Sequence, residues 1–302
     1  MKKRILPVLA VILLMALFTS CGKKAETEPT AQTNENPATT EPTEKPADET
    51  GEKNNVTLKV GASPIPHEEI LKAIQPKLAE EGINLEIVTF TDYVQPNAAL
   101  TDKQLDANFF QHQPYLDSYN KSNGTDLVSA GNVHIEPLAL YSKKYTSLDK
   151  LPDKATIAIP NDPTNCGRAL LLLASKNIIT LKDPTALEST EKDIDQNPHG
   201  FVFKPLEAAM LPRTLEETDA AVINGNYAIE SGLTPTTNAL PLEKGQDARV
   251  IEGADSPYAN IIVVRSEDKD NENIKKLVDA LQSEDTKKFI EEKYKGGVIP
   301  AF

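Results

Sequence analysis

Cysteine is scarce in this sequence. Only two cysteines, Cys21 and Cys166, occur among its 302 residues. Two thiols form at most one disulfide, so a disulfide framework cannot hold a chain of this length together. The folded part of the protein must therefore be stabilised by a hydrophobic core.

Signature motifs of common enzyme classes are also missing. The chain has no G-x-S-x-G nucleophile elbow, no phosphate-binding P-loop and no G-x-G-x-x-G dinucleotide fingerprint. The residues from His67 onward begin like the zinc-protease motif H-E-x-x-H, but Leu71 stands where the second histidine is required. We therefore expect a protein that is not an enzyme.

Clusters of basic residues with interleaved aromatic residues are absent as well. The formal net charge is −13 at pH 7, and no run of Lys and Arg with interleaved aromatic residues occurs. A protein that binds a phosphate backbone gains free energy by releasing counterions, which requires a basic face. Nucleic acid is therefore not an expected partner.

The apolar run at the start of the chain is too short to span a bilayer. The basic residues Lys2 to Arg4 precede the apolar segment Ile5 to Phe18. This segment is short, because a membrane-spanning helix needs roughly 20 apolar residues. This pattern is typical of a secretory signal peptide. The following Thr19 to Gly22 resemble a lipobox, although Phe18 stands where such motifs usually have Leu. We expect residues 1–20 to be removed and Cys21 to be acylated, with plain secretion or an uncleaved anchor as the alternative.

Residues 21–55 are predicted to be a disordered tether. The segment from Gly22 to Asn55 consists largely of Glu, Thr, Pro, Lys and Asn. Such a composition cannot bury enough apolar surface to offset its conformational entropy. Acylation of Cys21 would anchor the protein in the cell membrane, facing the extracytoplasmic side.

Short apolar runs alternate with helical patterns in the rest of the chain, which indicates an α/β fold with parallel strands. The expected strands are Leu58 to Val60, Leu85 to Val88, Leu127 to Val128, Ile135 to Tyr141, Ala155 to Ile159, Phe201 to Phe203, Ala220 to Ile223 and Ile261 to Val264. Two of these runs, Ile135 to Tyr141 and Ile261 to Val264, are candidates for the crossovers of a bilobal protein. Ordinary core strands are the alternative for both.

Helices are expected between the strands. The stripe Ile70, Leu71, Ile74 and Leu78 predicts a helix from Glu68 to Glu81 that ends at Gly82, and Pro76 predicts a kink or a break within it. The capping residue Asp162 with Pro163 at the first helical position predicts a second helix, which should be buried.

The second of these helices carries a candidate ligand group. A pocket for a small amino acid needs a cation for the carboxylate, acceptors for the ammonium group and an apolar box for the side chain. Arg168 stands in the first turns of this helix, where its guanidinium and the free N–H groups of the helix would meet one carboxylate. A solvated surface arginine explains the position equally well.

Aromatic and amide side chains supply the other requirements of such a pocket. Tyr93, Phe110 and Tyr115 offer rigid walls against which a thioether would pack, although core filling also explains them. Asn224 and Asn260 lie in or after apolar strands, where an amide needs a partner such as a ligand or a turn.

The four histidines raise a metal carrier as a further alternative. Neutral imidazoles with carboxylates bind zinc or manganese, and His67, His112 and His134 lie near expected strand ends. No convergent set of acidic residues at ligand-like spacing is evident beside them. We therefore predict neither a metal site nor a cofactor.

Several long motifs occur along the folded part. They are Val60 to Ile70, Phe90 to Asn97, Ala107 to His112, Val133 to Pro137, Ile159 to Asn165, Val222 to Tyr227, Ser256 to Asn260 and the terminal Gly296 to Phe302. Taken together, these motifs resemble the methionine-binding lipoprotein family, the NlpA-type lipoproteins.

The resemblance implies a two-lobed α/β protein with the type II periplasmic-binding-protein fold and a ligand cleft between the lobes, preceded by the signal peptide and the disordered tether. On this basis, residues 56–139 form the first segment of lobe I and residues 140–235 form lobe II. Residues 236–302 form the return crossover and the second segment of lobe I.

The resemblance also implies roles for individual residues. Aromatic and imidazole rings would surround a thioether side chain: Tyr93, Phe110, His112, Tyr115 and His134. Arg168 would pair with the ligand carboxylate. Three amides would hydrogen-bond the amino-acid end of the ligand: Asn165, Asn224 and Asn260. Cys166 departs from the family, in which Gln or a similar polar residue is usual, and we expect a buried or rim thiol without an essential role.

The function implied is that of an extracytoplasmic, monomeric substrate-binding lipoprotein. It would capture methionine, L-methionine foremost, and deliver it to the permease and ATPase of an ABC importer. The alternatives are D-methionine, a methionine-containing dipeptide or another small amino acid as ligand. A surface lipoprotein with an interaction or adhesin role and a vestigial cleft is the alternative from another class.

Overall fold

The computed structural model describes residues 55–244, 249–252 and 257–302. The predicted signal peptide, the candidate lipidation site Cys21 and almost all of the predicted tether lie outside these residues. Among the described residues, the search for a helix with the length and apolar character to span a membrane finds none.

A mixed sheet of six strands, in the order β12-β4-β11-β3-β1-β2, forms one half of the described fold. Its strands are β1 (Val56–Ala62), β2 (Ile83–Thr89), β3 (Ala107–His112), β4 (Val128–Ile135), β11 (Asn260–Val264) and β12 (Ile299–Pro300). β1 runs parallel to β2 and β3, whereas β11 runs antiparallel to β3 and β4. The chain therefore returns to this sheet late in the sequence.

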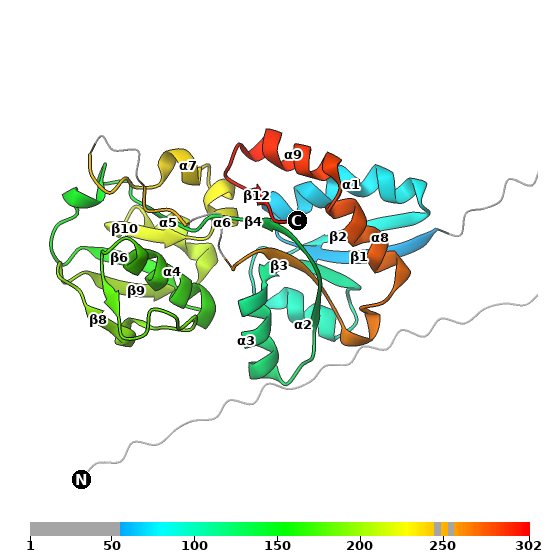
Figure 1. Ribbon diagram of the computed structural model, residues 1–302, viewed down its shortest axis with the longest axis horizontal. Coiled ribbons are helices and arrows are strands. Elements are labelled where there is room, and N and C mark those ends of the chain that lie inside the picture. The colour runs from blue at the N-terminus through cyan, green and yellow to red at the C-terminus, as the bar shows by residue number, and fades with distance from the viewer. Residues whose placement is uncertain (1–54, 245–248, 253–256) are drawn as a thin grey trace, which may run out of the picture. The chain divides into compact units, whose positions relative to one another are not determined.

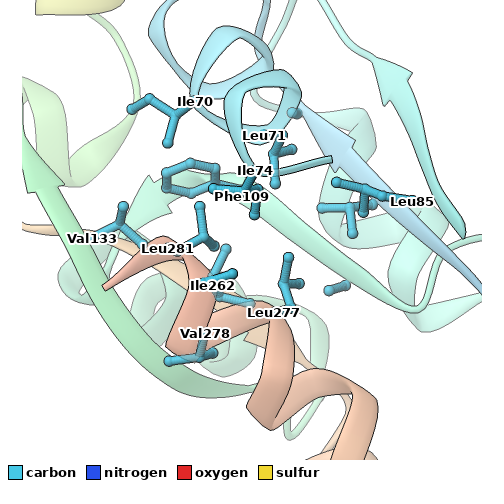
Figure 2. Packing of buried hydrophobic residues seen from close by; sticks show 14 of the residues in the cluster. Ile70, Leu71, Ile74, Leu85, Phe109, Val133, Ile262, Leu277, Val278 and Leu281 are labelled. Carbon is cyan, nitrogen blue, oxygen red and sulfur yellow. The ribbon is translucent and has the colours of Figure 1, made fainter. Parts of the chain in front are cut away.

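Helices cover both faces of this sheet (Figure 1). They are α1 (Glu69–Glu80), α8 (Glu272–Leu281) and α9 (Glu284–Tyr294) on one face, and α2 (Gln95–Thr101) and α3 (Gln113–Asn123) on the other. Figure 2 shows Ile70 and Leu71 of α1 and Leu277 and Leu281 of α8 packed around Phe109 of β3. The apolar stripe predicted for α1 is thus the stripe that is buried.

Strand β11 is buried on both of its faces. Ile262 and Val264 belong to the cluster beneath α1 and α8, whereas Ile261 and Val263 belong to the cluster with Leu100 of α2. Side chains of a strand alternate between the faces of its sheet, so a continuous apolar run fits a strand covered on both sides. The prediction that Ile261 to Val264 form a crossover is wrong; they form a core strand.

The other candidate crossover does connect two sheets. The run predicted as one strand divides into the end of β4, at Ile135, and the short strand β5 (Ala139–Tyr141) of a second sheet. The N–H of Glu252 donates to the carbonyl of Leu138 at 2.9 Å. This late segment of the chain therefore lies beside the first connection at Leu138.

The second sheet has four strands in the order β5-β10-β6-β9. Its other strands are β6 (Thr156–Pro160), β9 (Val202–Leu206) and β10 (Ala220–Ile223). Helix α4 (Pro163–Ser175) follows β6, and Asp162 caps it by accepting a hydrogen bond from the N–H of Asn165 at 2.9 Å. The cap and the burial predicted for this helix are both confirmed.

The shorter elements connect these layers. They are η1 (Pro64–Glu68), η2 (Leu148–Lys150), β7 (Thr180–Leu181), η3 (Glu191–Asp193), β8 (Ile194–Gln196), η4 (Ala208–Met210), α5 (Leu211–Thr214), α6 (Gly225–Glu230), α7 (Pro235–Asn238) and η5 (Ser266–Asp268). β7 and β8 pair with each other in a separate antiparallel ribbon.

Helix α1 differs from the prediction in one respect. It continues through Pro76 as one helix, so of the predicted kink or break, the break is wrong and the kink stays a prediction. Its end agrees with the prediction, because Gly82 follows the cap residue with a φ of +79°. That left-handed conformation favours glycine over residues with a side chain.

The division of the chain into lobes at residues 139/140 and 235/236 stays a prediction. Part of the segment predicted as the return crossover packs on the second sheet, because the N–H of Leu240 donates to the carbonyl of Leu140 at 2.7 Å. The N–H of Val250 in turn donates to the carbonyl of Leu240 at 2.9 Å.

Candidate functional site

Eight of the nine side chains predicted to contact a ligand line one small cavity: Tyr93, Phe110, His112, Tyr115, Asn165, Arg168, Asn224 and Asn260. Phe110 and His112 come from β3 of the first sheet, whereas Asn165 and Arg168 come from α4 of the second half of the fold. Ends of elements from both sheets therefore meet at this cavity.

Three aromatic rings form one wall of the cavity. The centroid of the Tyr93 ring lies 5.9 Å from that of Phe110 and 6.0 Å from that of Tyr115. The Phe110 and Tyr115 rings lie 5.8 Å apart, edge to face. The hydroxyl of Tyr115 donates to the carbonyl of Tyr93 at 3.0 Å, which fixes the loop before α2 against α3. Such rings form a rigid apolar surface.

A chain of hydrogen bonds fixes the orientation of the amides that form another wall of the cavity. Asn165 donates from its Nδ2 atom to the carboxylate of Asp162 at 3.0 Å, so its Oδ1 atom is left as an acceptor. That oxygen accepts from Nδ2 of Asn224 at 2.8 Å and lies 3.2 Å from Nε2 of His112.

His112 is held as a neutral ring with its proton on Nε2. Its Nδ1 atom accepts from the backbone N–H of Tyr115 at 3.2 Å and caps α3. Burial, assisted by the charge of Arg168, lowers the pKa of His112 to about 3. The ring therefore donates from Nε2 to the Oδ1 atom of Asn165.

Arg168 lines the cavity but already has an anionic partner that the sequence analysis missed. Its Nε atom donates to Oε1 of Glu252 at 2.9 Å, and Nη2 donates to the other carboxylate oxygen of Glu252. Nη2 also donates to the carbonyl of Glu136 at 2.9 Å, and the guanidinium lies 4.5 Å from the centre of the Tyr258 ring. These contacts hold the guanidinium in place, with 4% of Arg168 exposed.

His134 is the ninth predicted residue, and the structure places it behind the cavity rather than on its wall. Its Nε2 atom lies 2.7 Å from Oε1 of Glu136, and its ring centroid lies 4.9 Å from that of His67. It contacts Glu136 and lies opposite Asn260 in the sheet, and both of these residues line the cavity.

Gln111, Glu136 and Gly225 also line the cavity, and the sequence analysis named none of them as site residues. A signal for Glu136 was present, because residues two apart on an extended strand point to the same side and His134 precedes it at that spacing. Gly225 allows a close approach, since a Cβ atom there would lie 2.6 Å from Cβ of Glu136.

Cys166 lies on α4 between two site residues, and it is buried, as predicted. Burial raises the pKa of its thiol to about 12. The thiol is therefore protonated at physiological pH and is a poor nucleophile.

Known proteins that are similar to this chain belong to one family of lipoproteins. Residues 58–302 match the NlpA lipoprotein family. The D-methionine-binding lipoprotein MetQ of Escherichia coli O157:H7 is 43% identical over 252 residues, which cover 82% of this chain and 89% of that protein. The methionine-binding lipoprotein MetQ of Bacillus subtilis is 43% identical over 257 residues, which cover 83% and 89%.

A solved structure is similar as well. The nutrient binding protein from Burkholderia cenocepacia bound to methionine is 47% identical to this chain, with a TM-score of 0.76. The similarity covers 81% of this chain and all of that protein. It confirms the predicted fold, a two-lobed α/β fold of the periplasmic-binding-protein type.

Proposed function

Because the chain belongs to the NlpA lipoprotein family, we propose that it captures methionine outside the cytoplasmic membrane and delivers it to the permease and ATPase of an ABC importer. Membership makes the chain a substrate-binding protein and not an enzyme. The observation that carries the proposal is one cavity with an aromatic wall and a wall of amides and charges.

The aromatic wall suits a thioether side chain. Tyr93, Phe110 and Tyr115 line the cavity together, and their ring centroids lie 5.8–6.0 Å from one another. A polarisable sulfur packs favourably against aromatic rings, by about 0.3–1.5 kcal/mol for each contact. A methionine side chain would fill this end.

The wall of amides and charges suits the amino-acid end of the ligand. Arg168 would share its guanidinium between Glu252 and the ligand carboxylate, since a guanidinium carries five N–H donors. Asn165, Asn224 and Asn260 would complete the hydrogen bonds. L-methionine is the proposed ligand. The thermal-unfolding experiment described below distinguishes it from D-methionine and from a methionine-containing dipeptide.

Binding would involve opening of the cleft. The cavity has a free volume of about 20 Å³, whereas pockets for small molecules usually measure about 300 Å³ or more. We propose that residues 56–139 and 236–302 move as lobe I relative to residues 140–235 as lobe II, so that hinge rotation admits the ligand.

The N-terminal part of the chain completes the proposal. Acylation at Cys21 would anchor the protein to the extracytoplasmic face of the cell membrane, and the tether up to Asn55 would let a monomer reach its permease. Metabolic labelling with a fatty acid, compared between the wild type and Cys21→Ala, tests the anchor. Equal labelling of both proteins would contradict it.

Thermal unfolding of the full chain, purified in detergent, tests the ligand. L-methionine, D-methionine, glycyl-methionine and the other amino acids are added separately. A ligand at 100 times its Kd stabilises the native state by about 2.7 kcal/mol, so we expect L-methionine to raise the Tm most. No shift with any of these compounds would favour the interaction lipoprotein instead.

The role proposed for Arg168 has its own test. Replacing Arg168 by Ala should weaken methionine binding by roughly 2–5 kcal/mol, because the ligand carboxylate would be buried without its cation. Calorimetric titration measures the change, and the Tm of the ligand-free variant controls for folding. Normal affinity in Arg168→Ala would show that the carboxylate binds elsewhere.

A further inference from the structure

Three buried amides join α2 to β3 next to the cavity: Asn97 of α2, and Asn108 and Gln111 of β3. Nδ2 of Asn97 donates to Oε1 of Gln111 at 2.9 Å, and Nε2 of Gln111 donates back to Oδ1 of Asn97 at 2.6 Å. Nε2 of Gln111 also donates to Oδ1 of Asn108 at 3.0 Å, and Nδ2 of Asn108 donates to Oδ1 of Asn97 at 2.8 Å. These three side chains form a closed set of hydrogen bonds, the amide ring.

One backbone group fixes the direction of the hydrogen bonds in the amide ring. Nδ2 of Asn108 also donates to the carbonyl of Pro96 at 3.2 Å. A carbonyl only accepts, so this contact identifies the donor end of Asn108 and leaves its Oδ1 atom to accept from Gln111. Both polar atoms of the Gln111 side chain are used within the ring. Gln111 therefore lines the cavity without needing a ligand as its hydrogen-bond partner.

The amide ring lies at an irregular part of β3. Gln111 is opposite Ile261 of β11 and Phe109 is opposite Ile262, so Phe110 is an extra residue in the pairing of these two strands. One extra residue in one strand of an antiparallel pair is a β-bulge, which bends the strand locally. The cavity is thus built at a bulge of β3.

The bulge explains how Asn108 and Gln111 reach the same partner. These residues are three positions apart, and in a regular strand such side chains point to opposite faces of the sheet. The extra residue reverses the alternation, so both amides contact Asn97. A regular strand at this point would turn Gln111 away from Asn97. The amide ring therefore stabilises the bulge.

The two phenylalanines at the bulge have different surroundings. The ring of Phe109 lies 4.6 Å from that of His67 and belongs to the apolar cluster beneath α1 and α8 (Figure 2). The ring of Phe110 lies 5.9 Å from that of Tyr93 and 5.8 Å from that of Tyr115, and it lines the cavity. Bulges near functional sites redirect a side chain in this way. The bulge thus directs Phe110 into the aromatic wall.

The other end of the amide ring holds the segment that carries Tyr93. Asn97 lies in the first turn of α2, and Tyr93 lies just before this helix. The paired hydrogen bonds between Asn97 and Gln111 keep α2 and β3 in one relative position. A buried polar network in which each group has a partner is rigid and specifies one arrangement. The amide ring therefore fixes the separation of the Tyr93 and Phe110 rings.

We propose that Gln111 is a positioning residue that sets the length of the ligand side chain which the cavity accepts. With Asn97 and Asn108, it holds Phe110 and Tyr93 in place, so that these rings do not retreat from a longer side chain. The inference rests on the proposed function and narrows its substrate class to amino acids with a side chain no longer than that of methionine.

Calorimetric titration of the full chain in detergent, with L-methionine and with L-ethionine, tests this role. Ethionine has one more methylene group at the end of its side chain, and its amino-acid end is that of methionine. The readout is the ratio of the two Kd values. One methylene group changes affinity in an apolar pocket by about 10-fold to 200-fold, so the wild type should bind methionine at least about tenfold more tightly.

Gln111→Met removes the amide but keeps the approximate volume of the side chain. The ratio should fall to within about threefold, because Phe110 and Tyr93 are no longer held and a repacked wall loses its unique shape before the protein unfolds. The variant also leaves the amide of Asn97 buried without its partner, which lowers the stability. Denaturant unfolding of the ligand-free variant measures this loss and shows whether the variant is folded.

The double variant Asn97→Leu, Gln111→Met separates positioning from stability. Replacing both partners of a hydrogen bond by apolar groups of similar shape is nearly neutral for stability, so unfolding should return toward that of the wild type. The ratio should stay low, because the amide ring is still absent.

Asn197→Leu is the matched control. The amide of Asn197 pairs with the backbone N–H and carbonyl of Phe201, and this residue does not line the cavity. The change should lower the stability and leave the ratio of the wild type.

The outcomes are distinguishable. If the wild type does not bind methionine, the proposed function fails, and this inference fails with it. If the wild type binds methionine and ethionine equally well, the inference fails while the function stands. It also fails if folded Gln111→Met keeps the full ratio, if the double variant regains the ratio together with its stability, or if Asn197→Leu loses the ratio. Any of these three results would show that the hydrogen bonds of the amide ring do not set the accepted length.

Discussion

At the scale of single residues, the site depends on which atom of each polar group is left to face the cavity. Asp162 accepts from Asn165, Asn165 accepts from Asn224, and the Oδ1 atom of Asn224 has no hydrogen-bond partner among the described residues. The residue types could be found in the sequence, because each lies at the end of an expected strand or helix. Their orientation depends on contacts between distant segments, which no local pattern contains.

Glu136 illustrates the same limit. Its spacing from His134 was visible in the sequence, but His67 belongs to a segment before α1. Only the pairing of β11 with β4, which brings Asn260 opposite His134, gathers these groups at one place. Arg168 was predicted correctly as a residue of the cavity, whereas its partner Glu252 lies far along the chain.

The titration of Glu136 leads to a prediction about pH. Burial raises the pKa of this carboxyl above its ordinary value of 4.5. The groups that face it or sense its charge are His67, His134, Arg168, Tyr93 and Tyr294. Glu136 lines the cavity, so the ammonium group of the proposed ligand would favour the ionised carboxylate and lower its raised pKa again. Affinity is therefore complete above the raised pKa and is lost as the pH falls through it, by up to about tenfold per pH unit.

Titrations of methionine at a series of pH values from neutral to mildly acidic measure this effect. Glu136→Gln is the control, since it removes the titrating group and should bind equally weakly across the series. Methionine affinity that is constant in the wild type over this range would contradict the prediction.

At the scale of elements, the sequence predicted elements with local signals, but it missed an element whose polar residues are buried by contacts with distant segments. The helix α4 was predicted because its cap, its proline and its apolar face are adjacent in sequence. Strand β3 was not predicted, because Asn108, Gln111 and His112 interrupt its apolar residues. In the structure, Gln111 and Asn108 hydrogen-bond each other and Asn97, so these polar groups are buried without cost to the strand.

The start of α6 provides a prediction at this scale. A Cβ atom at Gly225 would lie 2.6 Å from Cβ of Glu136, so the helix or β4 must shift in Gly225→Ala. We expect the free energy of unfolding to fall by about 1–3 kcal/mol. Methionine affinity should fall as well, because the shift displaces both Glu136 and Asn224. Denaturant unfolding and calorimetric titration measure the two effects.

Gly124→Ala is the matched control for this helix start. Gly124 has a φ of +66° and open space around its Cα atom, at the end of α3. The change should cost about 1 kcal/mol through backbone strain and should leave affinity as in the wild type. If Gly225→Ala behaves like Gly124→Ala, the close approach does not position the site.

At the scale of the whole described fold, hydroxyl groups bridge the segments that carry the two sheets. Tyr93, in the loop after β2, donates to Oδ1 of Asn226 on α6 at 2.6 Å. Tyr227 on α6 donates to the carbonyl of Thr91 at 3.2 Å, and the two tyrosine rings lie 5.0 Å apart. The sequence indicated two candidate crossovers of a bilobal protein, but it did not indicate that these tyrosines join the two halves of the fold.

Tyr227→Phe tests whether this bridge holds the cleft closed. Tyr227 does not line the ligand cavity, so its hydroxyl acts on closure and not on a ligand contact. Loss of one hydrogen bond removes about 0.5–1.5 kcal/mol from the closed form, so methionine affinity should fall by about threefold to tenfold. In the proposed closure this bond forms after the ligand has entered, so the dissociation rate should rise while the association rate stays the same. Stopped-flow measurements separate these rates.

Tyr141→Phe is the matched control, since the Tyr141 hydroxyl is buried without a hydrogen-bond partner among the residues described, and its removal should change neither rate. A slower association in Tyr227→Phe would mean that the hydroxyl guides ligand entry and does not hold the closed cleft.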